Sequence, residues 1–154
     1  MTNRRGFVFC IGLLLTQCGG PPPPPPPPVV MLTITASAQQ NPDTAGKPSP
    51  VAVRIFQLNA TAKFERADVY ALIDREQQTL GADDAGSQEF VLAPGEVKTL
   101  KIEPKSGVSA IGVTAFYRDI DHAQWRADAP IASSGPTKLA AGIGALAVTL
   151  KSTP

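Results

Sequence analysis

The sequence predicts a mainly β protein, an antiparallel β-sandwich with a small helical element added to it. Between residues 29 and 154, short segments rich in β-branched and apolar residues follow one another, with turn signals between them. One stretch, Thr61–Leu80, lacks the alternation of a strand and contains good helix formers. Residues 29–154 are enough for one domain with a single hydrophobic core, and we predict that they form the sandwich.

The N-terminal segment has the form of a secretory signal. Met1–Arg5 carries two arginines and no acidic residue, and Phe7–Leu15 is almost wholly apolar. This apolar run is about half the roughly 20 residues that a membrane-spanning helix needs, which favours cleavage over spanning. We therefore predict a signal peptide over residues 1–17.

Cys18 lies where the apolar core of the signal ends, directly after Leu15-Thr16-Gln17. This arrangement resembles the bacterial lipobox, in which a small residue precedes a cysteine that is lipidated and becomes the new N-terminus. Gln17 departs from the pattern, because Gly, Ala or Ser is usual there. The resemblance implies a covalent diacylglycerol and an N-acyl lipid on Cys18, and we expect no other cofactor. The alternative is an ordinary signal followed by an unpaired cysteine.

The number of cysteines supports the lipidation of Cys18. The chain has two cysteines, and Cys10 lies within the predicted signal and leaves with it. A single remaining cysteine indicates a special thiol rather than a disulfide framework, and acylation would consume it. Gly19 follows Cys18, instead of the Asp that commonly retains lipoproteins in the inner membrane. The outer membrane is therefore the expected destination.

Eight consecutive prolines, Pro21–Pro28, follow the cysteine. Eight residues of polyproline II, at about 3.1 Å each, would hold the next domain roughly 25 Å from the lipid. Proline fixes φ, so this segment is stiffer than a flexible low-complexity linker, which is the alternative. We predict that residues 18–28 form a lipidated tether.

The predicted strands follow from the apolar pattern. They are Leu32–Ala38, Val51–Leu58, Gln88–Leu92, Val97–Ile102, Ala110–Tyr117 and Ala145–Leu150. The apolar phase of the second slips between Ile55 and Phe56, which predicts a bulge or burial on both faces. Ala110–Tyr117 is nearly all apolar, as is typical of a central strand. Pro94-Gly95 suits the centre of a type II turn, which predicts that the third and fourth strands form a hairpin.

One helix, or two short ones, is predicted within Thr61–Leu80. Apolar residues share a stripe at helical spacing in this stretch. The stripe consists of Val69, Leu72, Ile73 and Leu80. Phe64 and Tyr70 fall off it, and Asp83-Asp84 then reads as a solvated loop.

Charge and residue types argue against several function classes. Removing Arg4 and Arg5 from 14 basic residues leaves 12 against 13 acidic ones, so the remaining chain is near neutral. No basic patch or alternation of aromatic and basic residues suggests nucleic acid. We expect no nucleic-acid partner.

Catalysis also has little support in the residues. His122 is the only histidine, so a Ser-His or Cys-His arrangement is disfavoured, and we predict no catalytic residue and no enzyme activity. Asp119 and Asp121 with His122 would make only a weak metal cluster, and we predict no metal site. Trp125, the single tryptophan, fits a core position better than an exposed anchor.

Several short motifs occur in a specific order. They are Gln40-Asn41-Pro42-Asp43, Gly46–Pro50, Val51–Leu58, Phe64 with Ala67-Asp68-Val69 and Leu72, Leu92-Ala93-Pro94-Gly95, Ile111–Arg118 and Trp125-Arg126. Together with the lipobox, this order resembles the TssJ family, also called SciN or VasD, the outer-membrane lipoproteins of type VI secretion systems. The resemblance covers about residues 32–150. Val69 stands where Phe is more usual.

The resemblance implies a transthyretin-like β-sandwich with an added helical element, and a function without chemistry. Family members anchor the trans-envelope complex of the secretion system to the outer membrane, on its periplasmic face. They do so by binding the periplasmic C-terminal region of the inner-membrane protein TssM, in a complex that also contains TssL. The alternative is a generic periplasmic lipid-anchored β-sandwich that binds a ligand or a protein, because sandwiches host many functions.

In the family, the loop between the first two strands is a main contact with TssM. Here this loop consists of Asn41, Pro42, Asp43, Thr44, Ala45, Gly46, Lys47, Pro48, Ser49 and Pro50. Its three prolines restrict the backbone, so the loop loses less entropy on docking. Asp43 and Lys47 are its only charged residues and suit the orienting of a partner. The alternative is an ordinary proline-containing surface loop.

Overall fold

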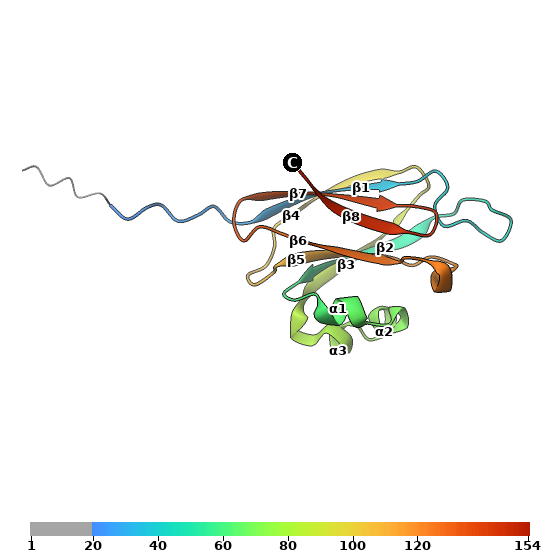
Figure 1. Cartoon of the computed structure of the whole chain (residues 1–154), viewed down its shortest axis with the longest axis horizontal. Coiled ribbons are helices and arrows are strands. Elements are labelled where there is room, and N and C mark those ends of the chain that lie inside the picture. Colours follow the sequence, from blue (N-terminus) through green and yellow to red (C-terminus); the bar gives the residue numbers. More distant parts are fainter. Residues whose placement is uncertain (1–19) are drawn as a thin grey trace, which may run out of the picture.

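The computed structural model describes residues 20–154; the predicted signal peptide and Cys18 lie outside the described residues. Eight strands within residues 20–154 form two four-stranded sheets that pack face to face, and short helices cover the outer face of one sheet (Figure 1). The predicted β-sandwich with an added helical element is thus confirmed. In the described part of the chain, no helix is both long and apolar enough to cross a membrane.

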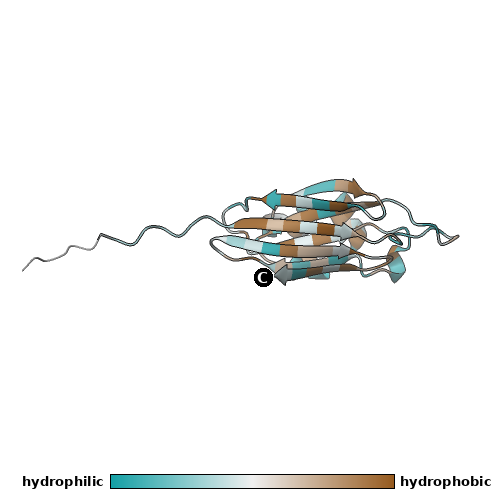
Figure 2. Cartoon of the chain, turned by 90° about the horizontal axis from the view of Figure 1, so that it is seen from above, coloured by the Kyte–Doolittle hydropathy of each residue, from teal (hydrophilic) through white to brown (hydrophobic). Residues whose placement is uncertain are grey.

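The first sheet has the order β4-β1-β7-β8. Its strands are β4 (Val97–Ile102), β1 (Val29–Ala36), β7 (Pro136–Ile143) and β8 (Val148–Thr153). β1 pairs with β7 in parallel, and the other two pairs are antiparallel. Figure 2 looks onto this sheet and shows apolar and polar residues alternating along its strands, because one face meets the core and the other meets solvent.

The second sheet has the order β3-β2-β5-β6 and is antiparallel throughout. Its strands are β3 (Asp84–Leu92), β2 (Val51–Leu58), β5 (Ala110–Ala115) and β6 (Arg126–Pro130). Every residue of β5 is buried, as predicted for a central strand. The bounds of β2 also match the prediction. Ile55 and Phe56 are both buried, so the slip in apolar phase reflects burial on both faces.

This double burial creates two apolar clusters. Ile55 points into the core between the sheets, whereas Phe56 points outward under the helices. The helical layer consists of α1 (Ala62–Arg66), α2 (Val69–Asp74) and α3 (Glu76–Leu80), followed by a 3₁₀ turn over Gly81–Asp83. The second sheet is therefore covered on both sides, by the first sheet and by the helices (Figure 1).

The helical layer differs from the predicted one or two helices. The backbone is extended at Ala67 and Asp68, and the Asp68 carboxylate accepts hydrogen bonds from the N–H groups of Tyr70 and Ala71, so a new helix begins there. The predicted stripe is interrupted at this break. Phe64, which fell off the stripe, is fully buried, whereas Ile73, which lay on it, is 39% exposed.

A glycine lets the helical layer approach the sheet. Gly112 of β5 pairs with Phe56, and the Phe56 and Phe64 rings lie 5.2 Å apart at an angle of 57°. A Cβ on Gly112 would meet Phe64 Cζ at 2.8 Å and Leu58 Cδ1 at 3.1 Å. The absence of a side chain at this position therefore makes room for the buried phenylalanine pair.

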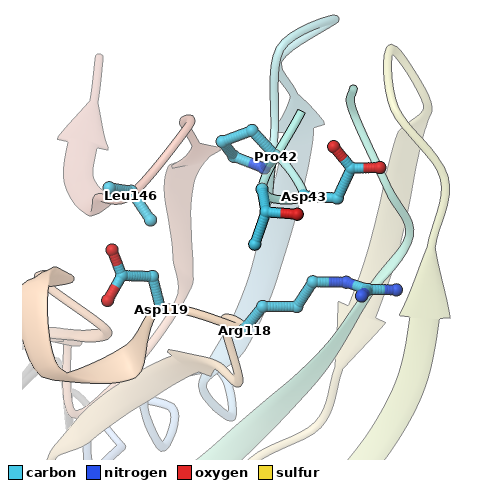
Figure 3. A pocket seen from close by; sticks show the side chains of 6 residues that line it. Pro42, Asp43, Arg118, Asp119 and Leu146 are labelled. Atoms are coloured by element: carbon cyan, nitrogen blue, oxygen red, sulfur yellow. The ribbon is translucent and has the colours of Figure 1, made fainter. Parts of the chain in front are cut away.

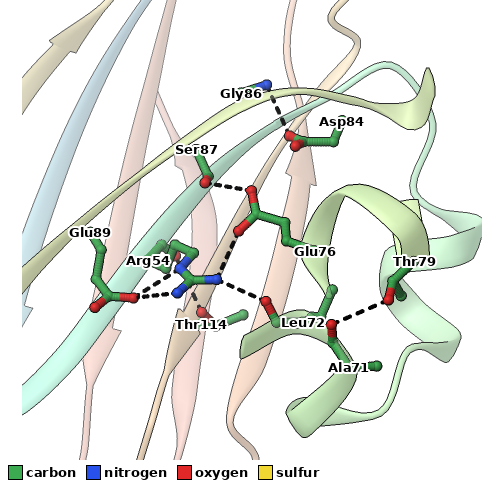
Figure 4. A network of polar contacts seen from close by, with 10 residues as sticks. All are labelled: Arg54, Ala71, Leu72, Glu76, Thr79, Asp84, Gly86, Ser87, Glu89 and Thr114. Atoms are coloured by element: carbon green, nitrogen blue, oxygen red, sulfur yellow. Dashed lines mark hydrogen bonds and ion pairs between the residues drawn. The ribbon is translucent and has the colours of Figure 1, made fainter. Parts of the chain in front are cut away.

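Arg54 joins the helices to the sheet (Figure 4). From β2, its guanidinium donates to Glu89 of β3 at 2.9 Å, to Glu76 of α3 at 2.7 Å and to the carbonyl of Leu72 at 2.8 Å. Its Cζ also lies 5.2 Å from the centre of the Phe116 ring. A planar guanidinium has five donors in a fixed arrangement and can bond several acceptors at once. The ammonium group of a lysine has three donors and lacks this planar arrangement.

The predicted hairpin is wrong, although its turn is right. Gly95 has φ +77°, and Glu96 N–H donates to the Ala93 carbonyl at 3.1 Å, as in a type II turn. However, β3 pairs with β2, and β4 pairs with β1 in the other sheet. Type II turns splay the flanking strands instead of matching their twist, which suits a crossing between sheets.

Other boundaries also need correction. β1 covers Val29–Ala36 in place of 32–38, and β3 begins four residues before the predicted strand. The last strand begins at Val148, because 145–147 form a loop, and β6 and β7 were not predicted. Asp83-Asp84 is not a free loop: Asp83 forms an ion pair with Lys63 at 3.3 Å, and Asp84 begins β3.

Candidate functional site

The segment between β1 and β2 lies at one end of the long axis of the sandwich, and the proline tether leaves from the other. Figures 1 and 2, which view the chain from directions 90° apart, both show this arrangement. Residues 21–27 are exposed to solvent. The two features that the sequence singles out are therefore separated by the whole length of the domain.

The base of the loop is held by two buried polar side chains, Gln40 and Asn41, which are 0% and 3% exposed. Gln40 Nε2 donates to the carbonyl of Leu92 at 2.6 Å and of Ser49 at 3.4 Å. The Ser49 N–H returns a bond to the Gln40 carbonyl at 3.1 Å. These contacts join the two legs of the loop to each other and to the end of β3.

Asn41 connects the loop to two other segments. Its Nδ2 donates to the Pro50 carbonyl at 2.8 Å, and its Oδ1 accepts from the Arg118 N–H at 2.8 Å. Its own N–H donates to the Ala145 carbonyl at 3.0 Å. Asn41 has φ +46°, a left-handed conformation that asparagine tolerates better than most residues. Because it is buried, Asn41 acts within the loop and does not offer its side chain to a partner.

The tip of the loop is organised by Asp43. Its Oδ1 accepts from the N–H groups of Ala45 and Lys47, each at 2.9 Å. The Asp43 N–H donates to the Lys47 carbonyl at 2.9 Å, and the Gly46 N–H donates to the Asp43 carbonyl at 2.9 Å. Gly46 has φ +79°, which completes the tight turn. The Asp43 carboxylate therefore shapes the loop, in addition to any effect of its charge on a partner.

The residues available at the surface follow from this construction. Thr44, Ala45, Gly46, Lys47 and Pro50 are exposed, whereas Pro42, Asp43, Pro48 and Ser49 are half-buried. The loop thus presents a short tip on a base with bonds to β3, to Arg118 and to Ala145. A loop held in this way is already ordered before it meets a partner, which reduces the entropy lost on binding.

A pocket of about 400 Å³ opens beside the loop (Figure 3). Its lining residues are Pro42, Asp43, Thr44, Arg118, Asp119 and Leu146. The last three come from the segment after β5 and from the β7–β8 connection. No local pattern predicts that these three residues lie beside the loop, because only the fold brings their segments to the same end of the sandwich.

The Asp119 carboxylate lies on the rim of this pocket and pairs with His122. His122 Nδ1 lies 2.6 Å from Asp119 Oδ1, and both side chains are largely exposed. The hydrogen bond and the charge of Asp119 raise the pKa of His122. Across residues 20–154, no group of three or more His, Cys, Asp or Glu side chains is arranged to hold a metal ion.

Trp125 lies at the edge of the core. It is partly buried and packs against both apolar clusters. The Arg126 guanidinium lies 4.6 Å from its ring centre and donates to the carbonyls of Phe64 at 2.9 Å and of Ala67. The Trp-Arg pair thus fastens α1 to β6, and Trp125 is not an isolated exposed anchor.

A sequence model described as the type VI secretion lipoprotein family (VasD, EvfM, TssJ, VC_A0113) matches residues 28–148. The chain belongs to this family. The match begins at the last residue of the tether, Pro28, and covers the sandwich as far as Val148. No curated protein sequence matches the chain.

Solved structures of type VI secretion lipoproteins support this family assignment. The crystal structure of the lipoprotein TssJ1 from Pseudomonas aeruginosa is similar with a TM-score of 0.81 and 33% identity, over 84% of this chain and 98% of that one. Lip from Serratia marcescens, a membrane-bound component of the type VI secretion system, has a TM-score of 0.75 and 25% identity, over 83% and 99%. A chain of a type VI membrane complex has a TM-score of 0.65 and 25% identity, over 82% and 98%.

Proposed function

We propose that the protein is a non-enzymatic assembly lipoprotein that links the trans-envelope complex of a type VI secretion system to the outer membrane. In this proposal a diacylglycerol and an N-acyl chain on Cys18 hold the protein on the periplasmic face. The loop 41–50 binds the periplasmic C-terminal region of TssM, within a complex that also contains TssL. Family membership and the similarity to a chain of a type VI membrane complex support this assignment.

The placement of the loop relative to the tether is the observation that supports the proposal best. A protein that links a membrane to a second component needs two separate attachment points that do not compete for space. The tether and the loop lie at opposite ends of the sandwich (Figure 1). A membrane-attached tether would leave the loop on the far side of the domain, where a partner can approach it without contact with the lipid.

The pocket beside the loop extends the proposed contact surface. Pro42 and Leu146 give it apolar walls, Thr44 adds a hydroxyl group, and Arg118 with Asp119 add charges of both signs. Interfaces concentrate their binding energy in pockets that receive a partner side chain, surrounded by a polar rim. We therefore include Arg118, Asp119 and Leu146 in the proposed interface, next to loop residues 42–50, while the buried Asn41 positions the loop.

A pull-down with the periplasmic C-terminal fragment of TssM tests the loop. Deletion of Asp43–Pro48 removes the tip and leaves the buried base at Gln40 and Asn41, so we expect retention to be lost while the circular dichroism spectrum stays unchanged. Ala45→Arg places a bulky cation on the exposed tip and should weaken binding. Ser106→Arg adds the same charge at an exposed position at the tether end and serves as the matched control. Unchanged retention of the deletion variant, or equal losses in both arginine variants, would contradict the loop as the interface.

The lipid is tested by fractionation. Cys18→Ser removes the proposed acylation site, and the protein should move from the membrane pellet to the soluble fraction. Gln17→Ala restores a small residue before the cysteine, so it should increase the acylated fraction if Gln17 limits processing. Sedimentation of Cys18→Ser with membranes would count against a lipid anchor.

A further inference from the structure

The proline tether does not end where β1 begins, because its last residues are bound to the sandwich. Gly135, which precedes β7, donates its N–H to the Pro26 carbonyl at 3.1 Å. The carbonyl of the same glycine accepts from the Val29 N–H at 3.0 Å. Two main-chain bonds to one residue therefore enclose Pro27 and Pro28.

Only one of these bonds follows the parallel register of β1 with β7: the Val29 N–H bonds to Gly135 as that register requires, whereas the bond to Pro26 lies one residue beyond the position that the register gives. The regular register begins at Val29 with Pro136. Proline has no N–H, so within Pro21–Pro28 the tether can contribute only carbonyl acceptors to a sheet. The bond from Gly135 uses one of these acceptors, and Val29 provides the first donor. The sheet itself begins at Val29, and the bond to Pro26 attaches the tether to the sandwich outside the sheet.

Gly135 is suited to this contact. It is buried and has φ +73°, a conformation that L side chains rarely adopt. Pro28 is also partly buried, beside Val108 and Ile131 at the same end of the sandwich. The base of the tether is thus held by backbone bonds, with Pro28 partly buried against the domain, and the free part of the proline run is Pro21–Pro25.

We propose that residues 21–26 form a strut clamped to the sandwich at Gly135, and that this strut sets the direction of the domain as well as its distance from the tether's start. A joint at Val29 would let the sandwich swing freely, whereas bonds on both sides of Pro27-Pro28 remove that joint. The five free prolines span about 16 Å as polyproline II. In both views the tether leaves roughly along the long axis of the sandwich, away from loop 41–50 (Figures 1 and 2).

The consequence is that the orientation of the loop is coupled to the orientation of the tether. A flexible linker of the same length would sample many directions and would spread the loop over a large volume. A clamped polyproline segment restricts that volume, which raises the effective concentration of the loop wherever the geometry suits a partner. This inference concerns the chain itself and does not depend on which partner the loop binds.

Distances between two spin labels, measured by pulsed electron paramagnetic resonance, test the strut. The chain from residue 18 on, with Cys18→Ser, carries labels at Gly20→Cys and Thr99→Cys; both positions are exposed, and a Cβ at Gly20 meets no atom within 4 Å. We expect one narrow distance distribution. Replacement of Pro23-Pro24 by Gly-Ser should widen it at least about twofold, because it breaks the free part of the strut.

Replacement of Pro27-Pro28 by Gly-Ser is the matched control. The same two residue types are changed, but between the two bonds to Gly135, so the width should stay close to that of the parent. Equal widening in both variants would overturn the clamp at Gly135. A broad distribution in the parent chain, or no widening in the Pro23-Pro24 variant, would overturn the strut.

Discussion

The main-chain N–H of Arg118 donates a hydrogen bond of 2.8 Å to Oδ1 of Asn41, and so connects two segments that lie 77 residues apart in the sequence. One segment is the loop between β1 and β2, and the other leads from β5 to β6. Both line the pocket at the end of the sandwich, so this single bond fixes the two walls relative to each other.

Asn41→Ala should therefore disturb both stability and the site. It leaves the Arg118 N–H and the Pro50 carbonyl without their side-chain partner and places alanine at a positive φ, so we expect a loss of about 2–3 kcal/mol in the free energy of unfolding. Urea denaturation measures this loss. Asn41→Gly relieves the backbone strain but does not restore the lost bonds. Its free energy of unfolding should therefore lie between those of the parent and of the alanine variant. A loss below about 0.5 kcal/mol for alanine would contradict the role of Asn41.

Asp43→Ala should loosen the tip of the loop with little effect on global stability. The variant removes the acceptor of the Ala45 and Lys47 N–H groups, which are exposed to water when the bonds open. Hydrogen exchange followed by NMR should show faster exchange at these two amides, while the strands keep their protection. Asp43→Asn retains an oxygen acceptor and should preserve most of the protection; exchange as fast as in the alanine variant would show that the acceptor is not what orders the tip.

Gly112→Ala should destabilise the helical layer. Its Cβ would lie 2.8 Å from Phe64 Cζ, so the phenylalanine must move, at a cost of about 1–3 kcal/mol. The check is a double-mutant cycle with Phe64→Leu, measured by chemical denaturation. We expect Gly112→Ala to cost less in the Phe64→Leu background, because the clash is relieved. Strictly additive losses would contradict direct packing between these two residues.

Because Tyr117 is buried, the stability of the protein should depend on pH in the alkaline range. Its O–H donates to the Gly144 carbonyl at 3.2 Å. Burial raises the pKa of Tyr117 from 10.0 to about 12, against a smaller lowering by a main-chain bond from Ala147. The folded state thus binds this proton more tightly than the unfolded state. The resulting stability is fully present below about pH 10 and is lost as the pH rises toward about 12.

Two measurements check this dependence. The chain has two tyrosines, so absorbance titration of Tyr117→Phe should lose the late-ionising one and keep the other. The free energy of unfolding of this variant should fall less between pH 10 and pH 12 than that of the parent. An identical decline in both proteins would show that Tyr117 is not the group responsible.

Local pattern was enough to predict some elements of the fold. β2 and β4 have the predicted bounds, and β5 is central. The dense β-branched and apolar residues of β2 and β5 indicate burial directly, whereas in β4 Leu100 and Ile102 alternate with the exposed Thr99 and Lys101. β6 was not predicted, because the apolar positions of this edge strand, Ala127 and Ala129, are alanines, which give a weak strand signal although they alternate with Arg126 and Asp128. β7 was missed although Leu139, Ala141 and Ile143 alternate, because glycine and alanine dilute the signal.

The pairing of strands and the composition of the site were harder to predict from the sequence. The turn at Pro94-Gly95 was predicted correctly, but a turn does not specify whether its flanking strands share a sheet. The loop 41–50 was delimited by its prolines and by the family resemblance. Its pocket partners, Arg118 and Leu146, are brought to it only by long-range pairing, which no local pattern contains.

The parallel pairing of β1 with β7 sets the order in which the chain can complete its fold. β1 follows the tether directly, yet its two neighbours in the sheet are β4, which begins at Val97, and β7, which begins at Pro136. A chain that emerges with its N-terminus first must therefore hold β1 unpaired until most of the sequence has appeared. Contacts so distant in sequence close slowly. During that interval β1 exposes its apolar residues and its unpaired edges, which favours aggregation.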